Sequence, residues 1–448
     1  MQVCRPSMTT RRVAVIGGGV AGVLAALAAS RVGAKTTLFE SSKRIGLSKA
    51  LMPRLISDGS SEDDLVLPEA KSLAGASVDV RTGERVTSVQ RAEGKVRLES
   101  ASSRGRSAGF DSVVICTGAA AEAPELRGLS KPNVFLLKEP ADYVKLSKGL
   151  DALQTVAVSG PIPLALKLGE ILAAKGKRVQ VYCGKGGLES QYSRPVAEEI
   201  RRSLTSGESA ERLLLVDGPV DSILGVASVE AIVSGGSVRT CDAVVVVPGS
   251  VPSFPAVECQ RGRGGGLLVD SSMSTTMPGV FAAGDSAEIR FKSGSVPARL
   301  FSTSRVGGEV AGTNAAGGRT SVAPSWAVEQ TCFGLELCSA GLSEEEATAM
   351  GLDAATETGK SGEARFAREV RRETFVSMVY DTGTHQVYGL QIAGWRASAL
   401  SSTASLIVSQ GLTVEQLLHL ESPYSPGFSH EDSPIALTAG KIRKPERA

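Results

Sequence analysis

A short apolar segment followed at once by a glycine cluster constrains the fold of this chain more than any other feature. Residues 12–16 (RVAVI) predict a buried strand, and the pattern GxGxxG follows at Gly17, Gly19 and Gly22 before an alanine-rich helix. The first glycine permits a tight turn, the second lets backbone N–H groups approach a pyrophosphate, and the third lets the helix pack close to the strand. The helix N-terminus favours the anion. This part of the chain is therefore predicted to bind a dinucleotide.

A carboxylate follows where such a domain needs one. Residues 35–39 predict a second strand, and Glu40 ends it eighteen positions after Gly22. A carboxylate at this place accepts hydrogen bonds from a ribose diol.

Two later segments repeat the pattern of a strand that ends at a glycine. Residues 111–116 predict an apolar strand that closes on Thr117 and Gly118, and a second such segment ends at Gly284 and Asp285. We expect these pieces to meet at one site although they lie far apart in the sequence.

The three motifs together resemble those of the pyridine nucleotide-disulfide oxidoreductases, flavoproteins with two dinucleotide-binding domains. The resemblance implies FAD as cofactor, with Asp285 at its ribityl and pyrophosphate groups. It also implies a helix over roughly residues 298–315 whose N-terminus is directed at the flavin. The FAD-binding residues expected from the motifs and the resemblance are Gly17, Gly19, Val20, Ala21, Gly22, Glu40, Val86, Thr117, Gly118, Gly284, Asp285 and Ala298.

A second dinucleotide-binding domain is expected in the middle of the chain. Residues 153–158, 178–182 and 242–247 predict strands, and residues 162–174 predict a helix. In the family that the chain resembles, this domain binds NAD(P)H and is inserted within the FAD domain.

The nucleotide-binding loop of this second domain departs from the glycine pattern. Gly160 is kept, but Ile162 replaces the second glycine, and Pro161 and Pro163 each remove an N–H donor. Gly249, in the loop after the last strand, completes the candidate nicotinamide site with Gly160 and Ile162.

The acid of the second domain is also replaced. Cys183 stands at the end of the second strand, and Lys185, two positions later, is suited to a 2′-phosphate. NADH and NADPH are both possible, and a remodelled or empty site is the alternative.

The segment after Glu40 indicates the branch of the family but lacks the redox cysteine on which its usual chemistry depends. Residues 46–56 (GLSKALMPRLI) resemble the segment of coenzyme A-disulfide reductases, NADH oxidases and NADH peroxidases that carries one redox cysteine before a leucine-proline pair. Alignment at Pro53 places Ala50 at that cysteine. A methyl group cannot replace a thiolate as nucleophile or electron relay. Val20 also stands where the water-forming members tend to carry a histidine.

The remaining thiols are expected to be structural. The seven cysteines include no CxxC pair and none has the spacing of metal ligands, so no metal site is predicted. Rescue of the missing thiol by a displaced cysteine is the less favoured alternative. A buried apolar role is expected for Cys116, Cys183, Cys241, Cys259, Cys332 and Cys338.

The last third of the chain resembles the dimerisation domain of the same family. Residues 332–347 match its start, and Ser343 with Glu346 predicts a capping box at a helix N-terminus. Residues 375–380 and 387–394 predict paired strands.

Residues 422–429 resemble the segment that reaches the partner's flavin site in dimers of this family. Tyr424 is thereby the candidate catalytic residue, as a hydrogen-bond donor or acid, and packing at the interface is the alternative for it. His430, beside Glu431 and Asp432, is expected in solvent as an ion-pair member.

Composition excludes several classes of partner. The chain has 49 basic and 47 acidic residues, so no charge excess indicates a nucleic acid. Residues 13–30 carry no charge and approach the length of a membrane span, but their glycines and the following Glu40 favour the dinucleotide loop. The protein is expected to be soluble and cytoplasmic, without a membrane partner.

The predicted fold class is α/β, with two Rossmann-like dinucleotide-binding domains, each of three layers around a parallel sheet, and an α+β C-terminal dimerisation domain. The expected boundaries are 1–120 with 256–321 for the FAD domain, 121–255 for the NAD(P)H-type domain and 322–448 for the dimerisation domain.

The predicted function is that of an FAD-dependent oxidoreductase, a homodimer that passes electrons from NAD(P)H or another donor through flavin to a small-molecule or protein acceptor. The usual cysteine relay is absent. A non-catalytic FAD-binding partner subunit and a disulfide or persulfide reductase with a displaced cysteine are the alternatives.

Overall fold

The computed structural model describes residues 10–101, 108–205, 211–361, 373–425 and 429–442. The chain divides into two compact units. The first contains Met1–Leu51, Ser61–Ala120 and Ser250–Pro324, and the second contains Met52–Ser60, Ala121–Gly249 and Ser325–Ala448.

A sheet of five parallel strands forms the centre of the first unit. In sheet order these strands are β19 (Val280–Ala282), β7 (Ser112–Ile115), β1 (Arg12–Ile16), β2 (Lys35–Glu40) and β3 (Val78–Thr82). The inner strands are buried apolar runs, as both faces of a parallel sheet are covered. Because the strands are parallel, the loops that follow β1, β7 and β19 lie at the same edge.

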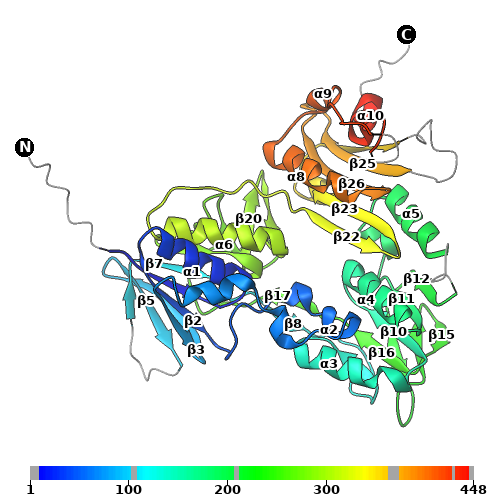
Figure 1. The fold of residues 1–448 in the computed structure, drawn as a ribbon, viewed down its shortest axis with the longest axis horizontal. Helices are drawn as coiled ribbons and strands as arrows, with labels where there is room; N and C mark the ends of the chain where they lie inside the picture. The colour runs from blue at the N-terminus through cyan, green and yellow to red at the C-terminus, as the bar shows by residue number, and fades with distance from the viewer. Residues whose placement is uncertain (1–9, 102–107, 206–210, 362–372, 426–428, 443–448) are drawn as a thin grey trace, which may run out of the picture. The chain divides into compact units, whose positions relative to one another are not determined.

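Two helices pack against each other on this sheet, α1 (Val20–Arg31) and α6 (Phe301–Ala315) (Figure 1). Their close approach depends on two glycines of α6. A Cβ atom at Gly308 would overlap the carbonyl oxygen of Ala21, and one at Gly312 would overlap that of Ala25. The glycines therefore fix the two helices at backbone contact distance.

Smaller antiparallel sheets complete the first unit. One contains β4 (Val86–Ala92), β5 (Lys95–Ser100) and β6 (Ala108–Phe110), and the other contains β20 (Ala287–Phe291) and β21 (Gly294–Pro297), with β18 (Leu267–Val269) parallel to β20. The strands β8 (Ala119–Glu122) and β17 (Gly249–Pro252) span the points where the chain passes between the units.

The second unit contains another parallel five-stranded sheet. Its strands in order are β12 (Leu213–Val216), β11 (Arg178–Tyr182), β10 (Thr155–Ser159), β16 (Ala243–Val246) and β9 (Val134–Leu136). The associated elements are α3 (Pro140–Gly149), α4 (Ile162–Ala174), α5 (Arg194–Thr205) and the antiparallel strands β13 (Ser222–Leu224), β14 (Ala231–Ser234) and β15 (Ser237–Thr240). The short helix α2 (Arg54–Ser57) lies beside α3.

The C-terminal part of the second unit is built on an antiparallel sheet. Its strands in order are β22 (Val328–Cys332), β23 (Leu335–Gly341), β26 (Val387–Gly394), β25 (Thr374–Asp381) and β24 (Ala354–Lys360). Its helices are α7 (Glu344–Ala349), α8 (Ser401–Gln410), α9 (Val414–Leu417) and α10 (Pro434–Ile442). Ser343 caps α7 in the expected capping box with Glu346.

The observed architecture confirms the α/β class with two parallel sheets, while the exact domain boundaries remain a prediction. One helix differs from expectation, because α6 begins at Phe301 rather than at Ala298. The N–H of Ala298 donates to the carbonyl of Ala287 at 3.1 Å, which holds this residue in extended backbone next to β20. Among the described residues, no helix combines the length and apolarity that crossing a membrane requires.

Candidate functional site

The loop after β1 has the backbone geometry that its glycines predict. Gly17 has φ +100°, in the left-handed region, and a Cβ atom there would overlap the carbonyl oxygen of Cys116. A Cβ atom at Gly22 would overlap the carbonyl oxygen of Gly17. Neither position accepts a side chain, so the tight turn and the close helix packing are structural requirements.

The start of α1 is open to an anion. Gly19 is its N-cap, no side chain caps the helix, and the first turn carries no acid. A Cβ atom at Gly19 would meet nothing within 4 Å. The N–H groups of the first turn, at Val20, Ala21 and Gly22, have no acceptor within the helix. This end of α1 therefore fits a pyrophosphate group.

Glu40 at the end of β2 is held against the same loop. Its Oε2 accepts a hydrogen bond from the N–H of Gly18 at 2.7 Å, and its Oε1 accepts one from the N–H of Ser42 at 2.6 Å. The half-buried carboxylate is thus oriented by two backbone donors and keeps lone pairs for a ribose diol. Glu40 lies where the sequence pattern predicts it.

The loops after β7 and β19 adjoin that of β1 at the edge of the sheet. The hydroxyl of Thr117 donates to the carbonyl of Ser253 at 2.5 Å, and Gly118 has φ +71°. Gly284 also has φ +71°, and a Cβ atom there would lie 3.1 Å from Cβ of Ala21. The residues expected to bind FAD after these three strands are therefore brought together.

Asp285 is a half-buried carboxylate at this edge. Burial raises its pKa above the usual range, whereas the positive charges of Lys49 and Arg299 act in the opposite direction. The Nζ of Lys49 also donates to the carbonyl of Ala119 at 3.3 Å. Two cations that the sequence analysis did not single out therefore lie near the expected FAD contact.

Ala50, at the position where the sequence comparison predicts the redox cysteine of the family, lies in the same unit as these groups. Lys49–Leu51 form a short 3-10 helix in which Lys49 and Ala50 are exposed. The preceding Ser48 is fully buried, and its hydroxyl has no hydrogen-bond partner within the part of the chain that the structure describes. Sequence reasoning missed Ser48 and Lys49, whose only signal was their adjacency to Ala50.

Two other expected FAD residues are apolar and buried. Val86, at the start of β4, is 7% exposed, and Ala298, just before α6, is fully buried. Only their backbone groups or van der Waals surfaces are available to a ligand. The first turn of α6 carries no acid, and the orientation of this helix end toward a flavin remains a prediction.

The loop after β10 in the second unit keeps one glycine for a reason of packing. Gly160 has φ +154°, and a Cβ atom there would lie 2.6 Å from Cβ of Val247. Ile162 is 6% exposed, so its side chain is turned into the protein. The N–H groups of Leu164 and Ala165 both donate to the carbonyl of Pro161, at 3.1 and 2.9 Å.

The second loop consequently has fewer groups for a phosphate than the first. Pro161 and Pro163 have no N–H, which leaves that of Ile162 as the donor at the start of α4. Gly249 is exposed at the start of β17. The loop has the shape for a dinucleotide and a reduced set of donors, and the nicotinamide assignment of Gly160, Ile162 and Gly249 remains a prediction.

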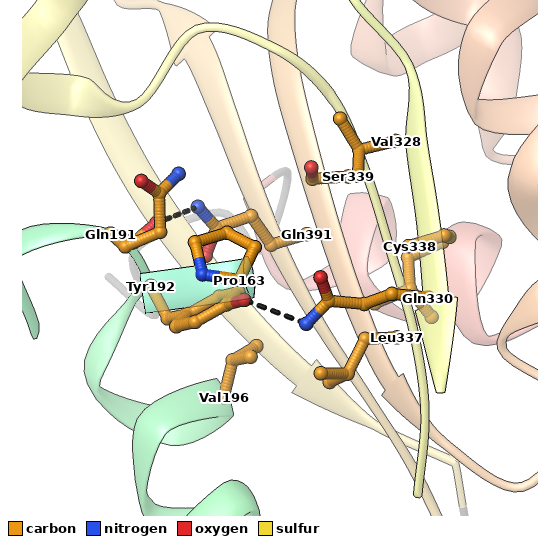
Figure 2. A pocket seen from close by; sticks show the side chains of 11 residues that line it. Pro163, Gln191, Tyr192, Val196, Val328, Gln330, Leu337, Cys338, Ser339 and Gln391 are labelled. Atoms are coloured by element: carbon orange, nitrogen blue, oxygen red, sulfur yellow. Dashed lines mark hydrogen bonds between the residues drawn. The ribbon is translucent and has the colours of Figure 1, made fainter. Parts of the chain in front are cut away.

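A pocket in the second unit lies between the start of α4 and the C-terminal sheet (Figure 2). The side-chain amide of Gln330 donates to the Tyr192 hydroxyl at 2.9 Å, and that of Gln391 donates to the carbonyl of Gln191 at 3.2 Å. None of the side chains that line it is charged. Its lining residues are Pro163, Gln191, Tyr192, Val196, Val328, Gln330, Leu337, Cys338, Ser339, Gln391 and Ile392.

The described cysteines have the properties of packing residues. Cys259 is half-buried and its Sγ lies 3.4 Å from the Thr275 hydroxyl. Within the described ranges, no three metal-binding side chains gather at one point. Burial raises the pKa to about 12 for the thiols of Cys116, Cys183, Cys241, Cys332 and Cys338.

Two C-terminal residues differ in how well they match expectation. Tyr424 is 40% exposed, and residues 426–428 of its segment lie outside the described residues.

The expectation of a solvated His430 is wrong, since it is 8% exposed, lies 3.2 Å from the Thr374 hydroxyl and packs edge-on against Trp395. Burial lowers its pKa, so it is neutral at pH 7. The adjacent acids suggested solvent, but the aromatic contact is tertiary and invisible in sequence.

Comparison with known proteins gives matches along nearly the whole chain. The family described as pyridine nucleotide-disulphide oxidoreductase matches residues 11–302, and its dimerisation domain matches residues 329–432. The NAD(P)H sulfur oxidoreductase (CoA-dependent) of Pyrococcus furiosus is 24% identical over 97% of this chain and 100% of that protein. The NADH oxidase of Methanocaldococcus jannaschii is 24% identical over 96% of this chain and 98% of that protein.

Solved structures show the same fold. An NAD-dependent persulfide reductase from A. fulgidus has a TM-score of 0.82 at 24% identity and covers 96% of this chain and 82% of its own. The water-forming NADH oxidase from Lactobacillus brevis, bound to NADH, has a TM-score of 0.83 at 17% identity and covers 97% and 99%.

Proposed function

Because the chain belongs to the pyridine nucleotide-disulfide oxidoreductase family, we propose that it is an FAD-dependent oxidoreductase that works without the cysteine relay. Its curated relatives include oxidoreductases of sulfur compounds and of NADH. In this proposal, NAD(P)H or another donor reduces the flavin, and a small-molecule or protein acceptor takes the electrons from it directly.

The arrangement around Gly18 and Glu40 is the observation that carries the proposal. Glu40 is oriented by the backbone N–H of Gly18, next to the open N-terminus of α1, and Asp285 lies at the same edge of the sheet. A ribose acceptor, a set of phosphate donors and a carboxylate for the ribityl chain are thus available together. When bound, FAD supplies the two-electron chemistry that no side chain of this site provides.

The residues of the site have the tasks of binding and orientation. The first turn of α1 stabilises the pyrophosphate charge, and Glu40 accepts hydrogen bonds from the ribose. Lys49 and Arg299 partly offset the negative charge of Asp285. Ala50 supplies no thiol at the family position, so the acceptor must approach the flavin itself.

The burial of five thiols argues against any of them as a displaced redox cysteine. A thiol with a pKa of about 12 is almost entirely protonated at pH 7, and the protonated form is not the nucleophile. The same holds for all five buried cysteines of the described part.

A non-catalytic FAD-binding role is the second candidate. It is favoured by the reduced set of donors at Pro161 and Pro163 together with Ala50, since both departures remove parts of the usual electron path. In either case we propose a homodimer, supported by the match to the dimerisation domain, and a cytoplasmic location. Tyr424 as a group near the partner's flavin belongs to the same proposal.

An anaerobic visible spectrum of the purified protein tests the function. We expect a bound flavin whose main band bleaches on addition of NADH or NADPH. A flavin that dithionite bleaches but neither nicotinamide bleaches would exclude the nicotinamide donor and favour the non-catalytic role or another donor. Absence of flavin after reconstitution with FAD would overturn the proposal as a whole.

A further inference from the structure

The second unit has no acid directly after β11, where a dinucleotide-binding domain usually carries one. Another acid lies beside this position. Cys183 follows β11 and is 3% exposed, and burial raises its pKa to about 12. A buried neutral thiol is a poor acceptor for a ribose diol. The position in the sequence is therefore unsuited to the task.

The loop after β12 brings a carboxylate to this point. The N–H of Cys183 donates to the carbonyl of Val216 at 3.0 Å, and that of Gly184 donates to the carbonyl of Gly218 at 3.1 Å. These two bonds place Asp217 directly beside the end of β11. Both loops lie at the carboxyl edge of a parallel sheet, where dinucleotides bind.

Asp217 is held in place by a partner and by a glycine. Arg201 on α5 donates to its two carboxylate oxygens at 3.1 and 3.3 Å. Gly187 has φ +63°, and a Cβ atom there would lie 2.6 Å from Oδ1 of Asp217. A side chain at position 187 would thus displace the carboxylate.

The two acids around Arg201 are not equivalent. Glu189 receives the shorter bonds, at 2.6 and 2.8 Å, in a bidentate pair. The side chain of Asp217 is 53% exposed and its bonds to Arg201 are longer. Asp217 therefore keeps lone pairs directed to solvent, whereas Glu189 is committed to the guanidinium.

We propose that Asp217, positioned by Arg201 and Gly187, replaces the missing acid as acceptor for the adenosine ribose of a nicotinamide nucleotide and selects NADH over NADPH. This inference rests on the proposed function, in which a nicotinamide nucleotide is the donor. The 2′- and 3′-hydroxyls of NADH donate to the carboxylate. The carboxylate of Asp217 would instead repel the 2′-phosphate of NADPH, and the guanidinium of Arg201 is already paired with Asp217 and Glu189.

Equilibrium binding tests the inference without turnover. The full-length protein loaded with FAD is titrated by calorimetry with NAD⁺ and with NADP⁺, neither of which reduces oxidised flavin. We expect tighter binding of NAD⁺ by the wild type. Asp217→Asn should raise the Kd for NAD⁺ about 10-fold, the usual cost of losing a charged acceptor, and leave the Kd for NADP⁺ unchanged or lower.

The controls separate this inference from its premise. Glu198→Gln, on the same helix as Arg201 but paired with Arg194, should bind both nucleotides as the wild type does. Asp217→Glu should keep the preference for NAD⁺ and serves as the conservative variant if Asp217→Asn folds poorly. An unchanged Kd for NAD⁺ in Asp217→Asn, or tighter binding of NADP⁺ by the wild type, overturns this inference alone. Binding of neither nucleotide by the wild type overturns the nicotinamide donor as well.

Discussion

The loops after β1 and after β10 begin in the same way and differ in what they offer a ligand. Both start with a glycine that the neighbouring backbone requires, Gly17 against Cys116 and Gly160 against Val247. The first loop leads into free N–H groups, whereas Pro161 and Pro163 interrupt the second. A retained first glycine therefore reports on packing within the fold, and only the donors after it report on phosphate binding.

The acids of the two domains extend this contrast. Glu40 accepts two backbone hydrogen bonds at the loop it serves, while Cys183 occupies the corresponding place as a buried thiol. In the first domain, the glycine loop, the open helix N-terminus and the acid thus lie on the consecutive elements β1, α1 and β2. The second domain lacks two N–H donors, at Pro161 and Pro163, and the acid at Cys183. We infer that Asp217, which follows β12, replaces this acid.

The largest expected effect concerns Cys183. Because burial raises its pKa to about 12, about one thiol in 10⁴ is ionised at pH 8, against a substantial fraction for an ordinary cysteine. Alkylation by iodoacetamide should therefore be roughly a thousandfold slower than for a free thiol and rise about tenfold per pH unit up to pH 10. Peptide mass spectrometry measures it, with the protein unfolded in guanidinium as control. Rapid labelling at pH 8 would contradict this prediction and would support Cys183 as a reactive, displaced cysteine.

The third position of each glycine pattern provides a matched pair. Gly22→Ala forces a Cβ atom onto the carbonyl oxygen of Gly17, so FAD affinity should fall at least about 100-fold and the protein should purify without flavin. Ala165→Gly, the equivalent position in α4, should retain full flavin and lose only about 1 kcal/mol of unfolding free energy. Absorbance at the flavin band and thermal unfolding report the two results. Equal flavin loss in both variants would contradict the difference between the loops.

The acid of the first domain should have a smaller effect. Glu40→Gln keeps the shape but removes the charge that accepts from Gly18 and from the ribose, so the Kd for FAD should rise about 10-fold. Quenching of FAD fluorescence during reconstitution of the apoprotein measures this change. Glu93→Gln, an exposed residue of the same unit, is the control. An unchanged Kd would show that Glu40 does not contact FAD.

Much of the fold could be predicted because it depends on local patterns. The apolar runs of α4, β11 and β26 were expected with the observed bounds, since charged residues, proline or glycine limit each of them. The start of α6 was placed too early because Ala298 is fixed by a bond to Ala287 that no local pattern reveals.

The site was predictable only where its residues follow a strand in the sequence. Glu40 and Asp285 were found in this way, because a strand end fixes where they lie. Asp217 also follows a strand, β12, but the sequence analysis did not predict that strand, and the pairing of Asp217 with Arg201 joins its loop to a separate helix. The buried hydroxyl of Ser48 was missed because burial at a loop depends on tertiary packing.

The smallest effect is expected from a substitution that restores one N–H donor to the second loop. Pro163→Ala returns an N–H group to the first turn of α4, where the helix dipole favours a phosphate, so the Kd for NAD⁺ should fall about 3- to 5-fold. Pro68→Ala, at the start of a short helix in the first unit, changes the same kind of position and should leave NAD⁺ binding unaltered. Calorimetric titration of both variants measures the change.

A gain in NAD⁺ affinity confined to Pro163→Ala would show that the second loop lies against the pyrophosphate and that its missing N–H donors limit binding. No gain would mean that the loop keeps Gly160 for its packing against Val247 alone, and that nucleotide binding, where it occurs, depends on the ribose contact.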